Sequence, residues 1–329
     1  MISEKRGGSQ RMGGSSRADP EYSSSAMPHN ADAGDHPGGP VYRAPVLMVV
    51  HAHPDDESSQ TGGTLATYAA AGWHTVLITC TDGRGGDGPG GVKPGDAGHD
   101  PHQVAAQRHR ELDLAAVALG IGEVVRLGYP DSGPTPGEHV PSEAFSVRAL
   151  MPMVTRLVRL IRLHQPAVIV TYPPNGLSGH PDHIRAHQLV TAALQNIDAN
   201  RTATTGGTGP LLYYIAVSRG RLAGMRASAR TVLGPQMWSP PDDMAIDDEQ
   251  ITTVIDIAAH WPDKLRALSA HASQADAAML SVVLSAAGIH RVEEFVRADH
   301  IADTLNGALE AGFGGPAPGE ISSGAIRSG

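Results

Sequence analysis

The chain has 329 residues, of which 40% are hydrophobic, and a formal net charge of -9 at pH 7. The length suffices for one large α/β domain, and no stretch reaches the roughly 18 apolar residues of a membrane-spanning helix, so we expect no membrane insertion. The acidic balance excludes nucleic acid as a favoured partner, because phosphate-backbone binding needs a clustered basic face. The single cysteine, Cys80, excludes an internal disulfide and fits a reducing compartment, so we expect a cytoplasmic protein.

Composition divides the chain into three parts. Residues 1–41 are rich in Gly, Ser, Asp and Pro and contain almost no aliphatic side chains. Such a segment cannot bury enough surface to offset its chain entropy, and residues 314–329 have the same character. We therefore predict a disordered leader over 1–41, one folded domain over 42–313 and a disordered tail over 314–329.

Between these ends, short aliphatic runs alternate with helix-like segments, which indicates βαβ units and a parallel sheet. The runs are continuous rather than alternating, as expected for strands covered on both faces. The predicted strands are 46–50, 75–79, 124–127 and 168–171, and the predicted helices are 61–71, 103–119, 145–164 and 181–195. Further segments follow at 211–217, 219–230 and 251–257. We predict a Rossmann-like α/β fold, with a mostly parallel sheet, helices on both faces and a C-terminal extension.

Two clusters of carboxylate and imidazole side chains follow predicted strands. Residues 51–57 read His-Ala-His-Pro-Asp-Asp-Glu directly after the first strand. Residues 180–183 read His-Pro-Asp-His and follow the fourth strand through the loop 173–179. Ligands of open α/β sheets bind beyond the carboxyl ends of the strands, so we expect both clusters on the same rim of the sheet.

Catalytic zinc typically takes three protein ligands from His, Asp or Glu and leaves one position for water. The two clusters supply enough ligands, and a further carboxylate could deprotonate that water while an imidazole protonates the departing amine. Each cluster alone has an ordinary explanation, since Asp55, Asp56 and Glu57 could cap a helix. His180 and His183 could likewise be surface residues. Their occurrence together at matched strand ends favours a metal site.

Two competing interpretations start from other residues. His183 and His187 stand one helical turn apart, as in the His-Glu-x-x-His metalloproteases, but position 184 is isoleucine, so the general base of that motif is missing. Gly62 and Gly63 open the helix after the first strand, which would suit a non-catalytic nucleotide- or sugar-binding module. A full Gly-x-Gly-x-x-Gly turn is absent from that position.

The pairing of residues 52–57 with residues 180–183 resembles the PIG-L family of zinc-dependent de-N-acetylases, and most of all its mycothiol-related branch. Further matches are Arg108, Glu111 and the segments 131–133 and 264–274. The resemblance implies an enzyme that hydrolyses linear amides, most simply by de-N-acetylating a small N-acetylglucosamine-type conjugate. An amidase acting on thiol conjugates and a deacylase that tailors natural products remain alternatives within the same chemistry.

Carried over position by position, the resemblance also implies roles for the residues of both clusters. Zinc would be bound by His53, Asp56 and His183. Asp55 would be the general base that activates water, and His180 would act as the acid or as an electrostatic stabiliser of the oxyanion.

Three further roles follow from the same resemblance. Asp182 would orient a histidine, and Arg108 and Asp131 would lie near the polyol part of the substrate. Ordinary alternatives for the last two are a helix salt bridge and a turn-forming Asp. The sequence leaves open whether the chain forms a homo-oligomer.

The chain departs from the mycothiol-related pattern at one position. Ser178 stands where that branch has a Tyr whose hydroxyl polarises the scissile carbonyl, and a Ser is too short to replace it. Either Tyr172 or His180 compensates, or the substrate differs from mycothiol precursors. The loop 82–100, with its many glycines, is expected to be either a mobile lid or a disordered insertion.

Overall fold

The computed structural model describes residues 44–133, 140–199, 209–234, 240–286 and 291–298. The predicted leader and tail lie outside the described residues. Within these ranges the strands form one seven-stranded sheet in the order β3-β2-β1-β4-β5-β7-β6. The strands are β1 Val46–His51, β2 His74–Thr81, β3 Glu123–Tyr129, β4 Val168–Thr171, β5 Leu211–Ala216, β6 Thr253–Asp256 and β7 Val292–Arg297. The first five strands pair in parallel, and β7 pairs antiparallel with β5 and with β6.

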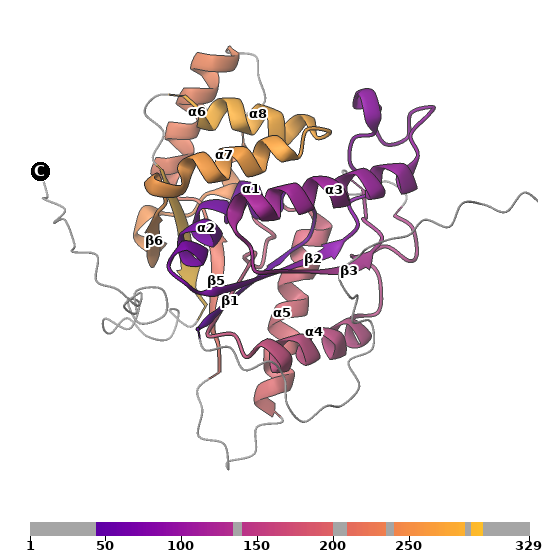
Figure 1. Ribbon diagram of the computed structural model, residues 1–329, viewed down its shortest axis with the longest axis vertical. Helices are drawn as coiled ribbons and strands as arrows, with labels where there is room; N and C mark the ends of the chain where they lie inside the picture. The colour runs from indigo at the N-terminus through magenta and orange to yellow at the C-terminus, as the bar shows by residue number, and fades with distance from the viewer. Residues whose placement is uncertain (1–43, 134–139, 200–208, 235–239, 287–290, 299–329) are drawn as a thin grey trace, which may run out of the picture. The chain divides into compact units, whose positions relative to one another are not determined.

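Helices cover both faces of this sheet (Figure 1). On one face lie α1 Asp56–Gln60, α2 Gly62–Ala70, α3 Pro101–Leu119 and α7 Trp261–Ala270, and on the other lie α4 Leu150–His164 and α5 Pro181–Ala199. The helices α6 Arg219–Leu233 and α8 Ala275–Leu284 pack together beyond α7. Single 3₁₀ turns at Pro89–Gly91, Asp242–Met244, Asp248–Gln250 and Ala258–His260 complete the described elements.

The sheet interior explains why the first four strands could be read from the sequence. Every residue of β1 and β4 is buried, because both faces of these central strands are covered. Cys80 is a buried free thiol in β2. The predicted mostly parallel α/β fold with helices on both faces is therefore confirmed. No helix in the described ranges is long and apolar enough to cross a membrane.

The predicted start of the third long helix was wrong. This helix, α4, begins at Leu150 rather than at residue 145. Phe145 is fully buried, stacks on Tyr129 with the ring centroids 5.6 Å apart, and donates its N–H to the carbonyl of Pro130. The apolar residue at the head of the predicted helix thus belongs to a packed turn that precedes it.

The strand β7 was not predicted. Its sequence, VEEFVR, places two carboxylates in the middle of a strand, and both are buried. Glu293 accepts hydrogen bonds from Lys264, and Glu294 accepts them from the N–H and the hydroxyl of Ser218. These partners come from distant parts of the chain, so local hydropathy could not reveal this strand, which lies between β5 and β6.

Candidate active site

The loop after β1 folds back on itself to present two adjacent carboxylates. Asp55 adopts φ 106°, a left-handed conformation that is rare for a residue other than glycine, and Asp56 then begins α1. The N–H of Asp55 donates to Glu57 Oε2 at 2.9 Å, and the N–H of His53 donates to Asp56 Oδ2 at 2.8 Å. The backbone thereby directs Asp55 and Asp56 to different sides of the loop.

The loop after β4 orients His183. Gly176 has φ 70°, and a Cβ at this position would lie 2.9 Å from the Cβ of His183 and from the backbone nitrogen of Ile184. Its carbonyl oxygen is 3.0 Å from His183 Nδ1, and the ring of Tyr172 stacks on the imidazole at 4.2 Å between centroids. With Nδ1–H donated to a carbonyl, Nε2 of His183 offers its lone pair to a metal.

The two loops converge on one carboxylate oxygen. Asp56 Oδ2 lies 3.3 Å from His53 Nδ1 and 3.5 Å from His183 Nε2. Ligand atoms around a tetrahedral zinc ion are about 3.3 Å apart, given metal–ligand distances of about 2.0–2.2 Å. His53 and His183 also form a potential metal-binding group with His180, whose ligand atoms lie within 4.8 Å of one another. The structure therefore places Asp56 beside both predicted histidine ligands, and a group that could hold a metal ion is formed by these two histidines with His180.

The charge balance of this cluster also fits a cation. Asp55, Asp56, Asp131 and Asp182 surround it, and Arg108 is the cation paired directly with one of them. Burial disfavours a charged His53, but Asp131 and hydrogen bonds to Asp182 and Asp56 outweigh it and raise its pKa well above the usual value. Carboxylates in excess of fixed positive charge thus draw a proton onto a predicted metal ligand, and a divalent cation would satisfy the same demand.

Asp182 contacts His53 from within the protein. It is fully buried, its Oδ2 lies 3.2 Å from His53 Nε2, and it accepts hydrogen bonds from both the N–H and the hydroxyl of Ser132. Asp131, predicted near the substrate, has its Oδ1 3.8 Å from the same nitrogen of His53. The role of Ser132 was not predicted, although it directly follows Asp131 at the carboxyl end of β3.

His180 lies against both predicted histidine ligands, with ring centroids 4.6 Å from His53 and 5.0 Å from His183. Its Nδ1 accepts the N–H of Asp182 at 3.1 Å, so the proton of the neutral ring resides on Nε2. Burial and the two neighbouring imidazoles lower the pKa of His180 to about 4. Among the two predicted roles, this environment favours a neutral hydrogen-bond donor over a proton-donating imidazolium.

Asp55 is held by Arg108, which comes from α3. The buried guanidinium donates to Asp55 Oδ2 at 2.8 Å, to the carbonyl of Gly83 at 2.8 Å and to the carbonyl of Pro54. Burial raises the pKa of Asp55 to about 6, against the opposing effect of Arg108. Arg108 thus holds the predicted base in place. All three hydrogen-bond acceptors of the Arg108 guanidinium belong to the protein.

Behind the first loop, buried charges from the C-terminal extension complete the support. Glu57 pairs with His271 at 2.7 Å, and both side chains are inaccessible to solvent. Glu293 accepts the N–H groups of Gly63 and Thr64 at the start of α2. This carboxylate occupies the anion-binding end of the helix, so the alternative of a phosphate-binding turn at Gly62 and Gly63 is not supported by the structure.

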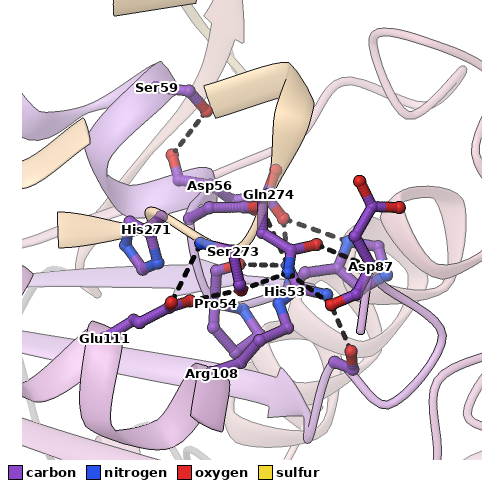
Figure 2. Close-up of polar contacts among 12 residues, drawn as sticks. His53, Pro54, Asp56, Ser59, Asp87, Arg108, Glu111, His271, Ser273 and Gln274 are labelled. Atoms are coloured by element: carbon purple, nitrogen blue, oxygen red, sulfur yellow. Dashed lines mark hydrogen bonds and ion pairs between the residues drawn. The ribbon is translucent and has the colours of Figure 1, made fainter. Parts of the chain in front are cut away.

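A polar network joins α3, the loop 82–100 and the segment after α7 (Figure 2). Glu111 accepts both the N–H and the hydroxyl of Ser273, which follows α7. The amide of Gln274 pairs with the backbone N–H and the carbonyl of Asp87, so the loop 82–100 is anchored to the C-terminal extension at this residue. His187 turns away from the cluster and faces the carbonyl of Tyr172.

Tyr172 was one of the two residues expected to replace the tyrosine that is absent at position 178. The hydroxyl of Tyr172 lies 3.0 Å from the N–H of Ala52 and 3.1 Å from His51 Nδ1, and the side chain is fully buried. The hydroxyl of Tyr172 is therefore occupied by partners within the protein, which argues against it as the replacement. Ser178 is exposed, with its hydroxyl 3.4 Å from His183 Nδ1.

Comparison with known proteins identifies sequence relatives of the chain. Residues 48–194 match the family described as GlcNAc-PI de-N-acetylase, PIG-L. A deacetylase of 1D-myo-inositol 2-acetamido-2-deoxy-α-D-glucopyranoside from Rhodococcus erythropolis strain PR4 is 38% identical over 242 residues, covering 69% of this chain and 80% of that protein. A protein of the same name from Thermobifida fusca is 37% identical over 267 residues, with coverages of 76% and 91%.

Two solved structures share the fold. N,N′-diacetylchitobiose deacetylase from Pyrococcus horikoshii has a TM-score of 0.52 at 19% identity, covering 79% of this chain and 85% of that one. A 4-carboxy-2-hydroxymuconate hydratase from Pseudomonas putida has a TM-score of 0.53 at 20% identity, with coverages of 77% and 96%. The hydratase illustrates that this fold alone does not determine the reaction.

The fold, the His/Asp cluster and the sequence relatives together define a hydrolytic N-deacetylase. The chain belongs to the PIG-L family. The family resemblance inferred from the two motifs is thereby confirmed.

Proposed function

We propose that the protein is a zinc-dependent de-N-acetylase of a small N-acetylglucosamine conjugate. The observation that carries this proposal is the position of Asp56 Oδ2, shared between His53 Nδ1 and His183 Nε2. A site of two imidazoles and one carboxylate suits zinc and leaves a position for water. Bound zinc would polarise the amide carbonyl and lower the pKa of water.

Asp55 is proposed as the base that takes a proton from the attacking water. A pKa raised to about 6 by burial keeps its carboxylate ionised at neutral pH, yet makes it more basic than a solvated Asp. Arg108 holds the Oδ2 atom in place at 2.8 Å. Protonated Asp55 can then pass the proton to the departing amine, so hydrolysis yields acetate and a free amino sugar with the protons balanced.

His180 is proposed to stabilise the negative charge that develops on the amide oxygen. Its Nδ1 already accepts the N–H of Asp182, which leaves Nε2–H as the donor. A neutral imidazole donor suits an environment that lowers the pKa of this ring to about 4. Asp182 in turn is proposed to orient His53 from behind, at 3.2 Å.

The substrate is proposed to lie on the open side of this cluster, near Asp131 and Ser178. The sequence relatives named above act on an N-acetylglucosamine joined to inositol, which supports a substrate of that class. We also propose that the reaction takes place in the cytoplasm, on the basis of the lone, buried and unpaired Cys80.

Substituting the proposed base tests the mechanism most directly. Asp55→Asn can adopt the left-handed backbone at this position, so the loop should keep its shape. We expect zinc content to be retained and kcat for acetate release to fall by about 10² to 10⁴, the usual contribution of a positioned base. His183→Ala is the matched control, which should lose the zinc of this site and the activity together.

The assay should compare an inositol-linked N-acetylglucosamine, N,N′-diacetylchitobiose and an amide of a thiol conjugate. Acetate release from the first two, abolished by a chelator and restored by zinc, is the expected result. A fully active Asp55→Asn enzyme would refute the assignment of the base. Hydrolysis of the thiol conjugate alone would replace the deacetylase with an amidase.

A further inference from the structure

A second group of metal-binding side chains lies at the opposite edge of the sheet from the candidate active site. His74 opens β2, Glu123 opens β3, and His164 is the last residue of α4. The clusters described above follow the carboxyl ends of β1 and β4, whereas this group stands at the amino ends of β2 and β3. We name it the amino-edge cluster.

The strand register brings two of these side chains to the same face. Glu123 pairs with Val76 across the parallel strands β2 and β3. His74 precedes Val76 by two residues, so its side chain leaves the sheet on the side of Val76 and Glu123. α4 ends over that face, where it adds His164.

The distances within the cluster suit a shared ion. His74 Nε2 lies 3.9 Å from Glu123 Oε2, and His164 Nε2 lies 3.7 Å from Glu123 Oε1. The three ligand atoms lie within 4.8 Å of one another. Ligand atoms around a tetrahedral zinc ion are about 3.3 Å apart, so side-chain rotations that move these atoms by up to about 1.5 Å would close the site.

The surroundings hold the cluster in place on one side and leave it accessible on the other. His164 is only 1% exposed, whereas His74 is 24% and Glu123 is 41% exposed. His74 Nδ1 faces Gly122, where a Cβ would come within 2.9 Å of it, and this close approach turns Nε2 towards Glu123. An ion could enter from the Glu123 side and keep a water molecule there.

We propose that His74, Glu123 and His164 bind a divalent cation of the zinc class that ties β2, β3 and α4 together. Two imidazoles and one carboxylate from three separate elements form a donor set suited to zinc. The ion would be structural rather than catalytic, because the amino-edge cluster lies across the sheet from the proposed base. This site is independent of the proposed function and would exist whatever the enzyme hydrolyses.

Zinc stoichiometry of the full-length protein tests the proposal. The chain should be stripped with chelator, dialysed against micromolar zinc and measured by elemental analysis. We expect two zinc ions per wild-type chain, one in His53→Ala, one in His164→Leu and none in the double variant. Zinc should also raise the melting temperature of His53→Ala, since an ion that binds only the folded state stabilises it.

Two further variants keep the test decisive. Glu123→Gln changes a partly exposed side chain, so it reports on the site even if His164→Leu fails to fold, and it should also bind one ion. His102→Ala removes an exposed imidazole from α3 and should still bind two. A single zinc in wild type, unaffected by Glu123→Gln and lost in His53→Ala, would overturn the amino-edge site and leave the proposed function intact. A single zinc lost only in Glu123→Gln would instead refute the proposed catalytic metal.

Discussion

The part of the chain before residue 200 and the part after residue 208 contribute different kinds of side chain to the candidate active site. The first part supplies the predicted ligands, from loops that directly follow β1 and β4. The second part supplies buried charges: Lys264 donates to Glu293 and to the carbonyl of Ser59, and His271 pairs with Glu57. The predicted ligands therefore come from strand ends, while the buried charges that contact the first loop and α2 come from a distant segment.

This difference explains what the sequence could predict. The predicted ligands follow the rule that functional residues stand at the carboxyl ends of parallel strands, so position and residue type sufficed to predict the two clusters. The family resemblance then singled out His53 and His183 within them. The supporting pairs obey no local rule. In the sequence, Glu293 looks like a solvent-facing residue. Only the folded chain brings Lys264 and the N–H groups of α2 to its carboxylate.

The dependence on long-range contacts also explains why the predictions for Phe145 and Tyr172 were wrong. Phe145 carries the apolar signal of a helix but is used in a turn, because Tyr129 offers it a packing partner. Tyr172 follows a predicted strand, and its sequence position could not reveal that its hydroxyl points back to Ala52 rather than outward. Long-range packing decided both cases, and hydrophobic periodicity does not encode it.

Breaking the support from the second part should have the largest effect on stability. His271→Leu leaves Glu57 charged and unpaired in a fully buried position. We expect the free energy of unfolding to fall by about 3–5 kcal/mol, as for other buried pairs that lose one partner. Urea denaturation measures it, and the double variant Glu57→Gln with His271→Leu, which removes the buried charge, should recover much of the loss. An unchanged midpoint in His271→Leu would show that the C-terminal extension does not support the loop.

Distorting the first part should affect the metal more than the fold. Gly176→Ala places a methyl group 2.9 Å from the Cβ of His183 at φ 70°. Gly179→Ala is a matched control, because its φ is 77° and nothing lies within 4 Å of the added methyl. Both should lose about 1–2 kcal/mol of stability to the left-handed backbone, but only Gly176→Ala should weaken zinc affinity, by about 10- to 100-fold. Equal zinc affinities in competition titrations would contradict the positioning role of this loop.

The buried pair also predicts a pH dependence. Burial opposes the charged form of each group, but Glu57 raises the pKa of His271 above 6.5 and His271 lowers the pKa of Glu57 below 4.5. Without these shifts the pKa values are 4.5 for Glu57 and 6.5 for His271. The pair therefore makes its full contribution to the free energy of unfolding between pH 4.5 and 6.5. This contribution is lost as pH rises through the folded pKa of His271, and as pH falls through that of Glu57. The stability of the wild type relative to the double variant should show this maximum, with a slope of at most about 1.4 kcal/mol per pH unit on either side. A difference that keeps rising above pH 8 would contradict it.

The smallest effect is expected at the exposed residue of the first part that departs from the family pattern. Ser178→Ala removes a hydroxyl 3.4 Å from His183 Nδ1, while the 3.0 Å contact of that nitrogen with Gly176 remains. Stability should change by less than about 0.5 kcal/mol and zinc content should not change, because exposed substitutions rarely cost more. If Ser178 contacts the substrate as proposed, KM should rise by about 2- to 10-fold through one lost hydrogen bond, with kcat nearly constant. A fall in zinc occupancy would instead assign Ser178 to the group that holds His183, alongside Gly176.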